Sequence, residues 1–249
     1  MKLEPIRIDG ADDCSRLVGL HYSPDRETKQ IGVVLAHGFT SSKHSMDSLA
    51  AYLAERGYEC VTFDAVGHKL GCTGGEMLRI EQSADNLKQA LEWMRANLGI
   101  TRTAVVGHSM GAAAAIQLAA WEGVKPDNHK PLCGIACLCM GVNPTAGFET
   151  VLGASMLAQR AGYVRGAPAR DLLAGLNNML SSAEMVRVPT LLVAARNDVL
   201  LPVASVEMLG KTMGALAEVR VIEAMHLDAP DKSRGVVYNW LEALRKREG

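Results

Sequence analysis

The sequence predicts an α/β fold: a mostly parallel, doubly wound sheet with helices on both faces. Short, nearly all-apolar runs rich in β-branched residues alternate along the chain with longer segments of helical period. Strands that are apolar throughout are typical of parallel sheets covered on both faces. The chain has 249 residues, of which 48% are apolar. That is enough material to bury one sizeable core, so we expect a single domain over residues 1–249.

The predicted sheet opens with a hairpin and continues with strands separated by helices. The hairpin takes residues 6–8 and 16–22. Further strands are predicted at 31–35, 59–63, 103–107, 134–140, 190–195 and 217–222. Helices are predicted at 45–56, 80–97, 110–121, 203–213 and 233–247. In the second of these, Leu87, Leu91 and Met94 fall on one stripe, as expected of a helix with one buried face.

Residues 141–188 interrupt this alternation, because they contain no strand pattern. Two helices are predicted there, at 146–160 and 168–185. Each has an apolar stripe: Phe148, Val151, Leu152 and Met156 on the first, and Leu172, Leu176, Met179 and Leu180 on the second. These stripes are compatible with packing on the body of the domain. We favour a small helical lid insertion at about 142–187, because insertions at the loop ends of such sheets tend to line pockets.

Composition excludes several classes of protein. The formal net charge of −1 argues against nucleic acid or an anionic membrane as a partner, since both attract clustered positive charge. The start, residues 1–5, lacks the apolar stretch of a secretory signal, so we expect a cytoplasmic protein. We also expect it to be a monomer or a homodimer. The six cysteines, at 14, 60, 72, 133, 137 and 139, lack metal-ligand spacing, so no metal is expected. Cys72, in a Gly-rich loop, is the thiol to test for reactivity.

A candidate nucleophile stands at 107–111, in Gly-His-Ser-Met-Gly. The segment follows an apolar strand and leads into an Ala-rich helix. A serine at such a corner sits on a tight, strained turn that lifts its Oγ above the carboxyl edge of the sheet. The N–H of Met110 then lies at the start of a helix, where partial positive charge favours a developing oxyanion. Ser109 is therefore predicted to be a catalytic nucleophile.

From about residue 31 to 240 the chain resembles the α/β-hydrolase family. The resemblance implies that residues 37–39, His-Gly-Phe after a strand, are the first oxyanion segment, with the N–H of Phe39 as second donor. A helix entry capped by Thr40 or Ser41 is the alternative. The family carries nucleophile, acid and base in that order, which implies Asp198 as the acid and His226 as the base.

The remaining histidines and acids have weaker contexts. His37 and His108 are expected to support the site, His68 to belong to a structural turn, and His21, His44 and His129 to lie on the surface. Asp64 is expected to accept structural hydrogen bonds, and Asp228 and Asp231 follow His226 too closely to reach its ring squarely. Lys69 stands where the family more often has a glycine, in a Gly-rich loop that borders the site in the family, so we expect the substrate mouth to differ from the common family form.

The predicted activity is hydrolysis of an ester or thioester of a small to medium, largely apolar substrate through an acyl-enzyme, with no cofactor. A serine hydroxyl needs a histidine to take its proton and a carboxylate to orient that histidine. The residues predicted to contact substrate are Phe39, His108, Met140, Phe148, Met156 and Met179. Carbon–carbon bond hydrolase, aminopeptidase or amidase, and cofactor-free haloperoxidase remain open on the same residues. So does a non-catalytic ligand-binding protein of this fold.

Overall fold

A computed structural model describes residues 1–9, 16–123 and 132–246. Within these residues eight strands form one sheet in the order β1-β2-β4-β3-β5-β6-β7-β8. Neighbours from β4 to β8 pair parallel, while β1 and β2 add an antiparallel edge. The strands are β1 (Lys2–Ile8), β2 (Leu17–Ser23), β3 (Ile31–Ala36), β4 (Glu59–Phe63), β5 (Arg102–His108), β6 (Leu132–Leu138), β7 (Thr190–Ala195) and β8 (Ala217–Ile222). The predicted fold class is confirmed.

Each predicted strand is found, with small shifts at the ends. The opening hairpin is longer than predicted, since its ladder runs from Lys2 opposite Ser23 to Ile8 opposite Leu17. Strand β6 ends at Leu138 instead of residue 140. The reason is that Cys139 has a φ of 52°, in the left-handed region, where a strand cannot continue.

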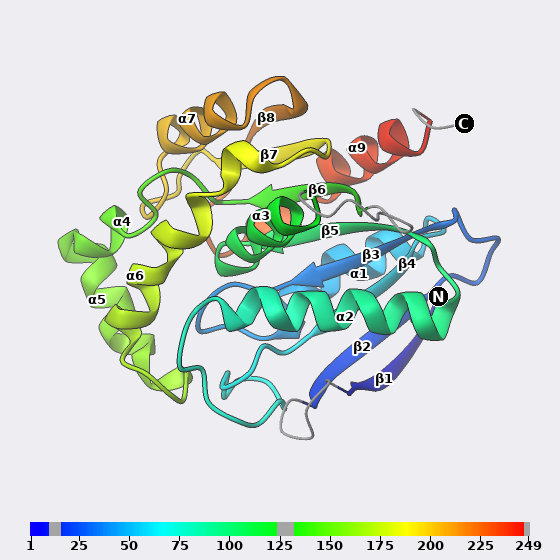
Figure 1. Ribbon diagram of the computed structural model, residues 1–249, viewed down its shortest axis with the longest axis horizontal. Helices are drawn as coiled ribbons and strands as arrows, with labels where there is room; N and C mark the ends of the chain where they lie inside the picture. Colours follow the sequence, from blue (N-terminus) through cyan, green and yellow to red (C-terminus); the bar gives the residue numbers. More distant parts are fainter. Residues whose placement is uncertain (10–15, 124–131, 247–249) are drawn as a thin grey trace.

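Helices cover both faces of the sheet (Figure 1). On one face lie α1 (Asp47–Ala54) and α9 (Arg234–Lys246), and on the other α2 (Gln82–Leu98), α3 (Met110–Gly123) and α7 (Val203–Met213). Alternate residues of β3 show the division: Val33 packs with α1 and α9, and Val34 packs with α2 and α3. Because both faces are buried, the strand is apolar at every position. A short helix, α8 (Ala229–Lys232), had not been predicted.

The connection between β6 and β7 lies beyond the carboxyl ends of the strands (Figure 1). It holds α4 (Ala146–Glu149), α5 (Val151–Arg160) and α6 (Ala169–Leu180), with 3-10 turns after α5 and α6. The predicted single helix over 146–160 is wrong, because Thr150 is extended and its side chain accepts a hydrogen bond from the N–H of Gly153, which caps α5. Val151 is 91% exposed and Leu152 is 54% exposed, so neither is buried on the predicted apolar stripe.

The second predicted stripe does pack on the body of the domain. Leu172, Leu176 and Met179 of α6 are buried in the core that contains α3. The segment 163–167, between α5 and α6, is bonded to the loop after β4. The N–H of Arg165 donates to the carbonyl of Gly67, and the N–H of Met77 donates to the carbonyl of Arg165, each at 2.8 Å. The middle of the β6–β7 connection is therefore attached to the loop after β4.

None of the helices in the described ranges has the length and apolar character needed to cross a bilayer.

Of the five described cysteines, none forms a disulfide, and only Cys72 is exposed. The surface prediction for His21 is wrong, because its ring is buried and lies 2.6 Å from the carboxylate of Glu59. Cys14, His129 and the linker-like segment 124–131 lie outside the described residues.

Candidate active site

Loops from the carboxyl ends of β3, β5, β7 and β8 meet at one edge of the sheet. Parallel strands share this edge, and β4 and β5 lie on opposite sides of β3, which is the kind of switch point where α/β sheets bind ligands. A pocket with a cavity volume of about 60 Å³ opens there. It is lined by Gly38, Phe39, Thr40, Ser41, Ser45, His108, Ser109, Phe148, Met156, Leu157, Arg160, Leu200, His226 and Leu227.

Ser109 occupies a strained corner between β5 and α3. Its φ is 51°, a value that residues other than glycine adopt rarely and that clusters at functional sites. The two flanking glycines allow the close approach of neighbouring backbone. A β-carbon on Gly107 would lie 2.2 Å from the carbonyl oxygen of Gly111, and one on Gly111 would lie 2.3 Å from that of Ala36. The turn is also held by the N–H of Ser109, which donates to Leu138 at 2.9 Å.

Asp198 and His226 form a buried pair on the loops after β7 and β8. The Nδ1 atom of His226 lies 2.7 Å from Oδ2 of Asp198. The other oxygen of Asp198 accepts hydrogen bonds from the N–H groups of Leu200 and Leu201, at 2.8 and 3.0 Å. These three hydrogen bonds fix the carboxylate against the His226 ring.

The electrostatics of the pair follow from these contacts. Burial by itself raises the pKa of Asp198, but the hydrogen bond and charge of His226, with the two backbone N–H groups, outweigh it and hold this pKa below its ordinary value. Asp198 is thus ionised near neutral pH and can only accept. The proton of a neutral His226 ring must then lie on Nδ1, which leaves Nε2 as a proton acceptor.

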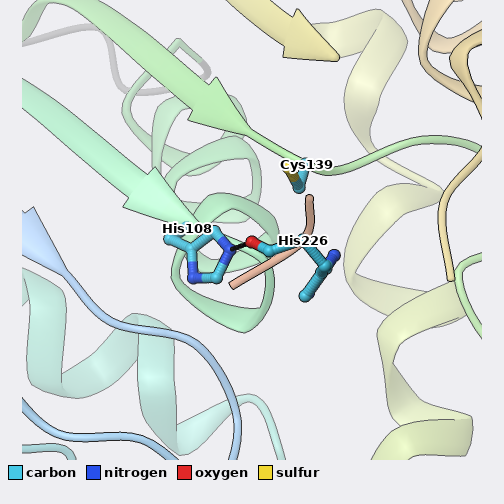
Figure 2. A group of neighbouring side chains, drawn as sticks. All are labelled: His108, Cys139 and His226. Atoms are coloured by element: carbon cyan, nitrogen blue, oxygen red, sulfur yellow. Dashed lines mark hydrogen bonds between the residues drawn. The ribbon is translucent and has the colours of Figure 1, made fainter. Parts of the chain in front are cut away.

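His108 and Cys139 gather around His226, as Figure 2 shows. The Nε2 atom of His108 lies 2.8 Å from the backbone carbonyl oxygen of His226, so Nε2 must carry a proton. Burial, followed by the charge of His226, lowers the pKa of His108 to about 3, so this ring stays neutral. Burial, followed by the charge of Asp198, raises the pKa of the Cys139 thiol well above its ordinary value. This thiol therefore stays protonated.

These three residues are also the candidate metal ligands in the described part of the chain. Their donor atoms lie within 4.8 Å of one another. However, Nε2 of His108 is bonded to the carbonyl of His226, and Nδ1 of His226 is bonded to Asp198. An ion bound through these two nitrogens would have to displace both hydrogen bonds. The internal bonds thus account for the cluster as it stands.

The segment after β3 forms a tight turn beside Ser109. The Nδ1 of His37 donates to the carbonyl of Gly38 at 2.8 Å, because its Nε2 already accepts from the N–H of Ala65 at 3.0 Å. The alternative of a helix entry capped by Thr40 or Ser41 is wrong, since the following 3-10 helix starts after Ser42. Among the described residues, the N–H groups of Phe39 and Met110 have no hydrogen-bond partner.

Arg160, at the end of α5, reaches this turn from the β6–β7 connection. Its Nε donates to Oγ1 of Thr40 at 3.0 Å, and its Nη2 donates to the Thr40 carbonyl at 3.2 Å. Thr40 has a φ of 61°, in the left-handed region. The guanidinium therefore holds a strained residue that directly follows Phe39. Sequence reasoning missed this contact because its two members are 120 positions apart.

The structure divides the residues predicted to contact substrate. Phe39, His108, Phe148 and Met156 line the pocket. Met140 and Met179 do not: both are fully buried in the main core, so the prediction for these two is corrected. Apolar character at helical or strand spacing could not distinguish core from pocket. The lining residues that the sequence analysis missed include Leu157, Arg160, Leu200 and Leu227.

Asp64 has the structural surroundings that were expected. It accepts hydrogen bonds from the ammonium of Lys43 at 2.7 Å, from the N–H of Lys43 at 2.8 Å and from the N–H of Cys72 at 2.8 Å. Both members of the ion pair are buried. Burial alone raises the pKa of Asp64, but these contacts outweigh it and hold the pKa below its ordinary value. Asp64 thereby joins the start of the α1 region to the loop after β4.

The sheet order, the strained serine corner and the buried His–Asp pair define an α/β-hydrolase. A family model described as serine aminopeptidase, S33, matches residues 27–160, more than half of the chain. The chain belongs to this family.

Two curated proteins resemble shorter parts of the chain. A thermostable monoacylglycerol lipase of Bacillus sp. (strain H-257) is 28% identical over 109 residues, covering 44% of this chain and 40% of the lipase. An acyl transferase of Photobacterium phosphoreum is 26% identical over 90 residues, covering 35% of this chain and 29% of the transferase. The matched region thus spans less than half the length of each relative.

Solved structures show the same fold at low sequence identity. The Pyrococcus furiosus esterase Pf2001 superposes with a TM-score of 0.74 at 21% identity, over 98% of this chain and 91% of the esterase. A highly thermostable carboxyl esterase from Bacillus coagulans gives 0.73 at 16% identity, over 98% and 99% of the two chains. At these identities the likeness supports the fold and leaves the chemistry to be argued from the site.

Proposed function

We propose that the protein is a serine hydrolase that cleaves an ester or thioester through an acyl-enzyme. The observation that carries this proposal is the buried contact between His226 and Asp198, on the same pocket as the strained Ser109. In this mechanism Ser109 is the nucleophile, His226 the general base and Asp198 the acid that orients the base. A strained backbone conformation costs free energy and is typical of functional sites. A non-catalytic role would not explain why Ser109 has this conformation beside the buried pair.

The reaction takes two steps. The Oγ of Ser109 bonds to the substrate carbonyl carbon as its proton passes to Nε2 of His226, and the same proton then leaves with the alcohol or thiol. A water molecule next gives a proton to His226 and attacks the acyl-enzyme, which releases the acid and returns the proton to Ser109. Asp198 keeps its negative charge throughout and stabilises the imidazolium.

We assign the oxyanion hole to the N–H groups of Phe39 and Met110. Support comes from their lack of other partners among the described residues and from the position of Met110 at the first turn of α3. Loss of one such donor costs about 2.7–4 kcal/mol of transition-state stabilisation in other acyl-transfer enzymes. Backbone donors cannot be removed by ordinary substitution, so they are tested indirectly, through the residues that hold the turn after β3.

The substrate proposed is small to medium and largely apolar. Phe148, Met156 and Leu157 supply an apolar wall from the β6–β7 connection. The similarity to a protein named a monoacylglycerol lipase is in keeping with an ester of an apolar chain. We further propose that residues 1–249 form one domain, in which 142–187 act as a lid over the pocket.

Fluorophosphonate labelling tests the nucleophile. Wild-type protein is expected to be labelled at one serine, and Ser109→Ala is expected to lose the label. If wild type stays unlabelled, or if Ser109→Ala is labelled equally well, the assignment of Ser109 is wrong. Ser45→Ala is a matched control, because Ser45 lies on the same pocket and has its hydroxyl bonded to the carbonyl of Ser42.

A second candidate, peptide hydrolysis, is favoured by the description of the family as serine aminopeptidases. The two are separated by kcat/KM for p-nitrophenyl esters, acyl-CoA thioesters and amino-acid anilides. We expect esters or thioesters to be preferred. A clear preference for anilides would replace the esterase proposal with an aminopeptidase.

A further inference from the structure

A second hollow lies in the β6–β7 connection, between α5 and α6. Its cavity volume is about 800 Å³, against about 60 Å³ for the pocket at Ser109. Figure 1 shows the two helices side by side beyond the carboxyl ends of the strands. Much of its wall is alanine, including Ala154, Ala158 and Ala174. This hollow, called the α5–α6 groove below, has no part in the mechanism described above.

The groove and the catalytic pocket share two lining residues, Phe148 and Leu157. Phe148 belongs to α4 and Leu157 to α5, and both side chains are half-buried. The two hollows therefore meet at these side chains. Phe148 and Leu157 are together called the partition below.

The chemistry of the wall indicates what could lie in the groove. The more buried lining residues Leu173, Phe148 and Leu157 are apolar, and together with the exposed methyl groups of Ala154, Ala158 and Ala174 they make an open apolar slot. The polar lining residues Glu149, Arg170 and Asn177 are exposed at the rim. Such a slot matches an unbranched hydrocarbon chain, which gains free energy for each methylene removed from water.

We infer that the α5–α6 groove is a subsite for the far end of an apolar chain of the ester, and that Phe148 and Leu157 set the chain-length limit. This inference rests on the proposed serine hydrolase function. With the partition in place, a short chain is held in the catalytic pocket. A longer chain reaches the groove only where these two side chains are removed or turn aside.

The test compares chain-length profiles of variants that open the partition. Phe148→Ala and Leu157→Ala are measured beside Leu152→Ala, a control on the same connection whose side chain is exposed and lines neither hollow. One arm uses p-nitrophenyl esters with acyl chains from acetate to dodecanoate. The other uses butyrate esters of alcohols of increasing length, with the released acid titrated. The two arms distinguish an acyl chain from an alcohol chain in the groove.

We expect the ratio of kcat/KM for ten-carbon over four-carbon chains to rise about ten-fold or more in Phe148→Ala or Leu157→Ala, in one of the two arms. The control should keep the wild-type ratio. Ala158→Trp, which fills the groove, should remove the gain when added to Phe148→Ala. The double variant also excludes a general loosening of the pocket as the cause of the gain. A gain caused by loosening would persist when the groove is blocked.

Fluorophosphonate labelling separates this inference from the proposed function. If the variants are labelled at Ser109 and hydrolyse short esters while neither profile shifts, the subsite is wrong and the hydrolase proposal stands. A gain that persists with Ala158→Trp also overturns the subsite. If wild-type protein is not labelled at all, the proposed serine hydrolase function is wrong, and the subsite inference that rests on it is wrong as well.

Discussion

The Nε2 atom of His108 donates a hydrogen bond across 2.8 Å to the backbone carbonyl oxygen of His226. The residue before the proposed nucleophile is thereby attached to the loop that carries the proposed base. On its other side, the His108 ring faces the turn after β3, because a β-carbon on Gly38 would lie 3.0 Å from Nδ1. His108 is thus a positioning residue that sets the spacing of three loops.

Replacing His108 should affect kcat more than KM. His108→Leu fits a similar volume but leaves the His226 carbonyl without a donor, at a cost of about 1–3 kcal/mol. We expect kcat to fall about ten- to hundred-fold, with KM little changed, while His108→Gln, which can still donate, recovers most of the loss. Because the low pKa of His108 keeps it neutral, the pH midpoint of kcat/KM should be the same in wild type and His108→Gln. Equal losses in both variants would contradict a positioning role.

Asp198→Asn tests the orientation of the base. An amide can donate to Nδ1 and so stabilise the wrong tautomer of His226, which leaves Nε2 unable to accept the serine proton. By analogy with other serine hydrolases, kcat is expected to fall by about 10⁴-fold. Asp231→Asn is the matched control, because Asp231 is exposed and pairs with Arg234. The acid assignment is wrong if the two variants have similar activity in steady-state ester hydrolysis.

Arg160 and Thr40 should be energetically coupled in catalysis. Loss of the guanidinium frees the strained turn that presents the N–H of Phe39, and small misplacements of reacting groups can cost up to about 10²-fold in rate. We expect Arg160→Ala and Thr40→Val each to lower kcat, and the double variant to lose less than the product of the two effects. Arg160→Lys should not restore activity, because an ammonium lacks the planar fork that meets both oxygens of Thr40. Independent effects in the double-mutant cycle would refute the coupling.

The Lys43–Asp64 pair makes stability depend on pH. The folded pKa of Asp64 lies below its ordinary value of 3.8, so the pair stabilises the fold above that pH and the contribution is lost as pH falls through the folded pKa. At pH 7, Asp64→Asn should lower the free energy of unfolding by about 3–5 kcal/mol, since it leaves the buried Lys43 charge without its partner. The difference from wild type should shrink at pH 3, as measured by urea denaturation. Asp85→Asn, at an exposed pair with Arg79, should have little effect at either pH.

Local sequence patterns predicted most of the strands and helices of the fold. Apolar runs of strand length and amphipathic segments predicted the strands and the main helices, because each element must bury one or both faces. The exceptions have local causes that single residues produce. Strand β6 stops at the left-handed Cys139, and the 146–160 helix is interrupted at the extended Thr150.

The sequence by itself determined the serine corner, since glycine spacing and position after a strand are local properties. Asp198 and His226 were indicated by the order of acid and base in the family that the chain resembles. Only the tertiary structure decided which side chains surround them. The contacts of His108 with His226 and of Arg160 with Thr40 join positions 118 and 120 residues apart. Met140, just after β6, and Met179, in α6, are both buried in the core. Their burial depends on how the end of β6 and the helix α6 pack against the rest of the domain. Such relationships follow from the packing of whole elements against one another. A short stretch of sequence cannot predict them, because it contains only one of the two partners.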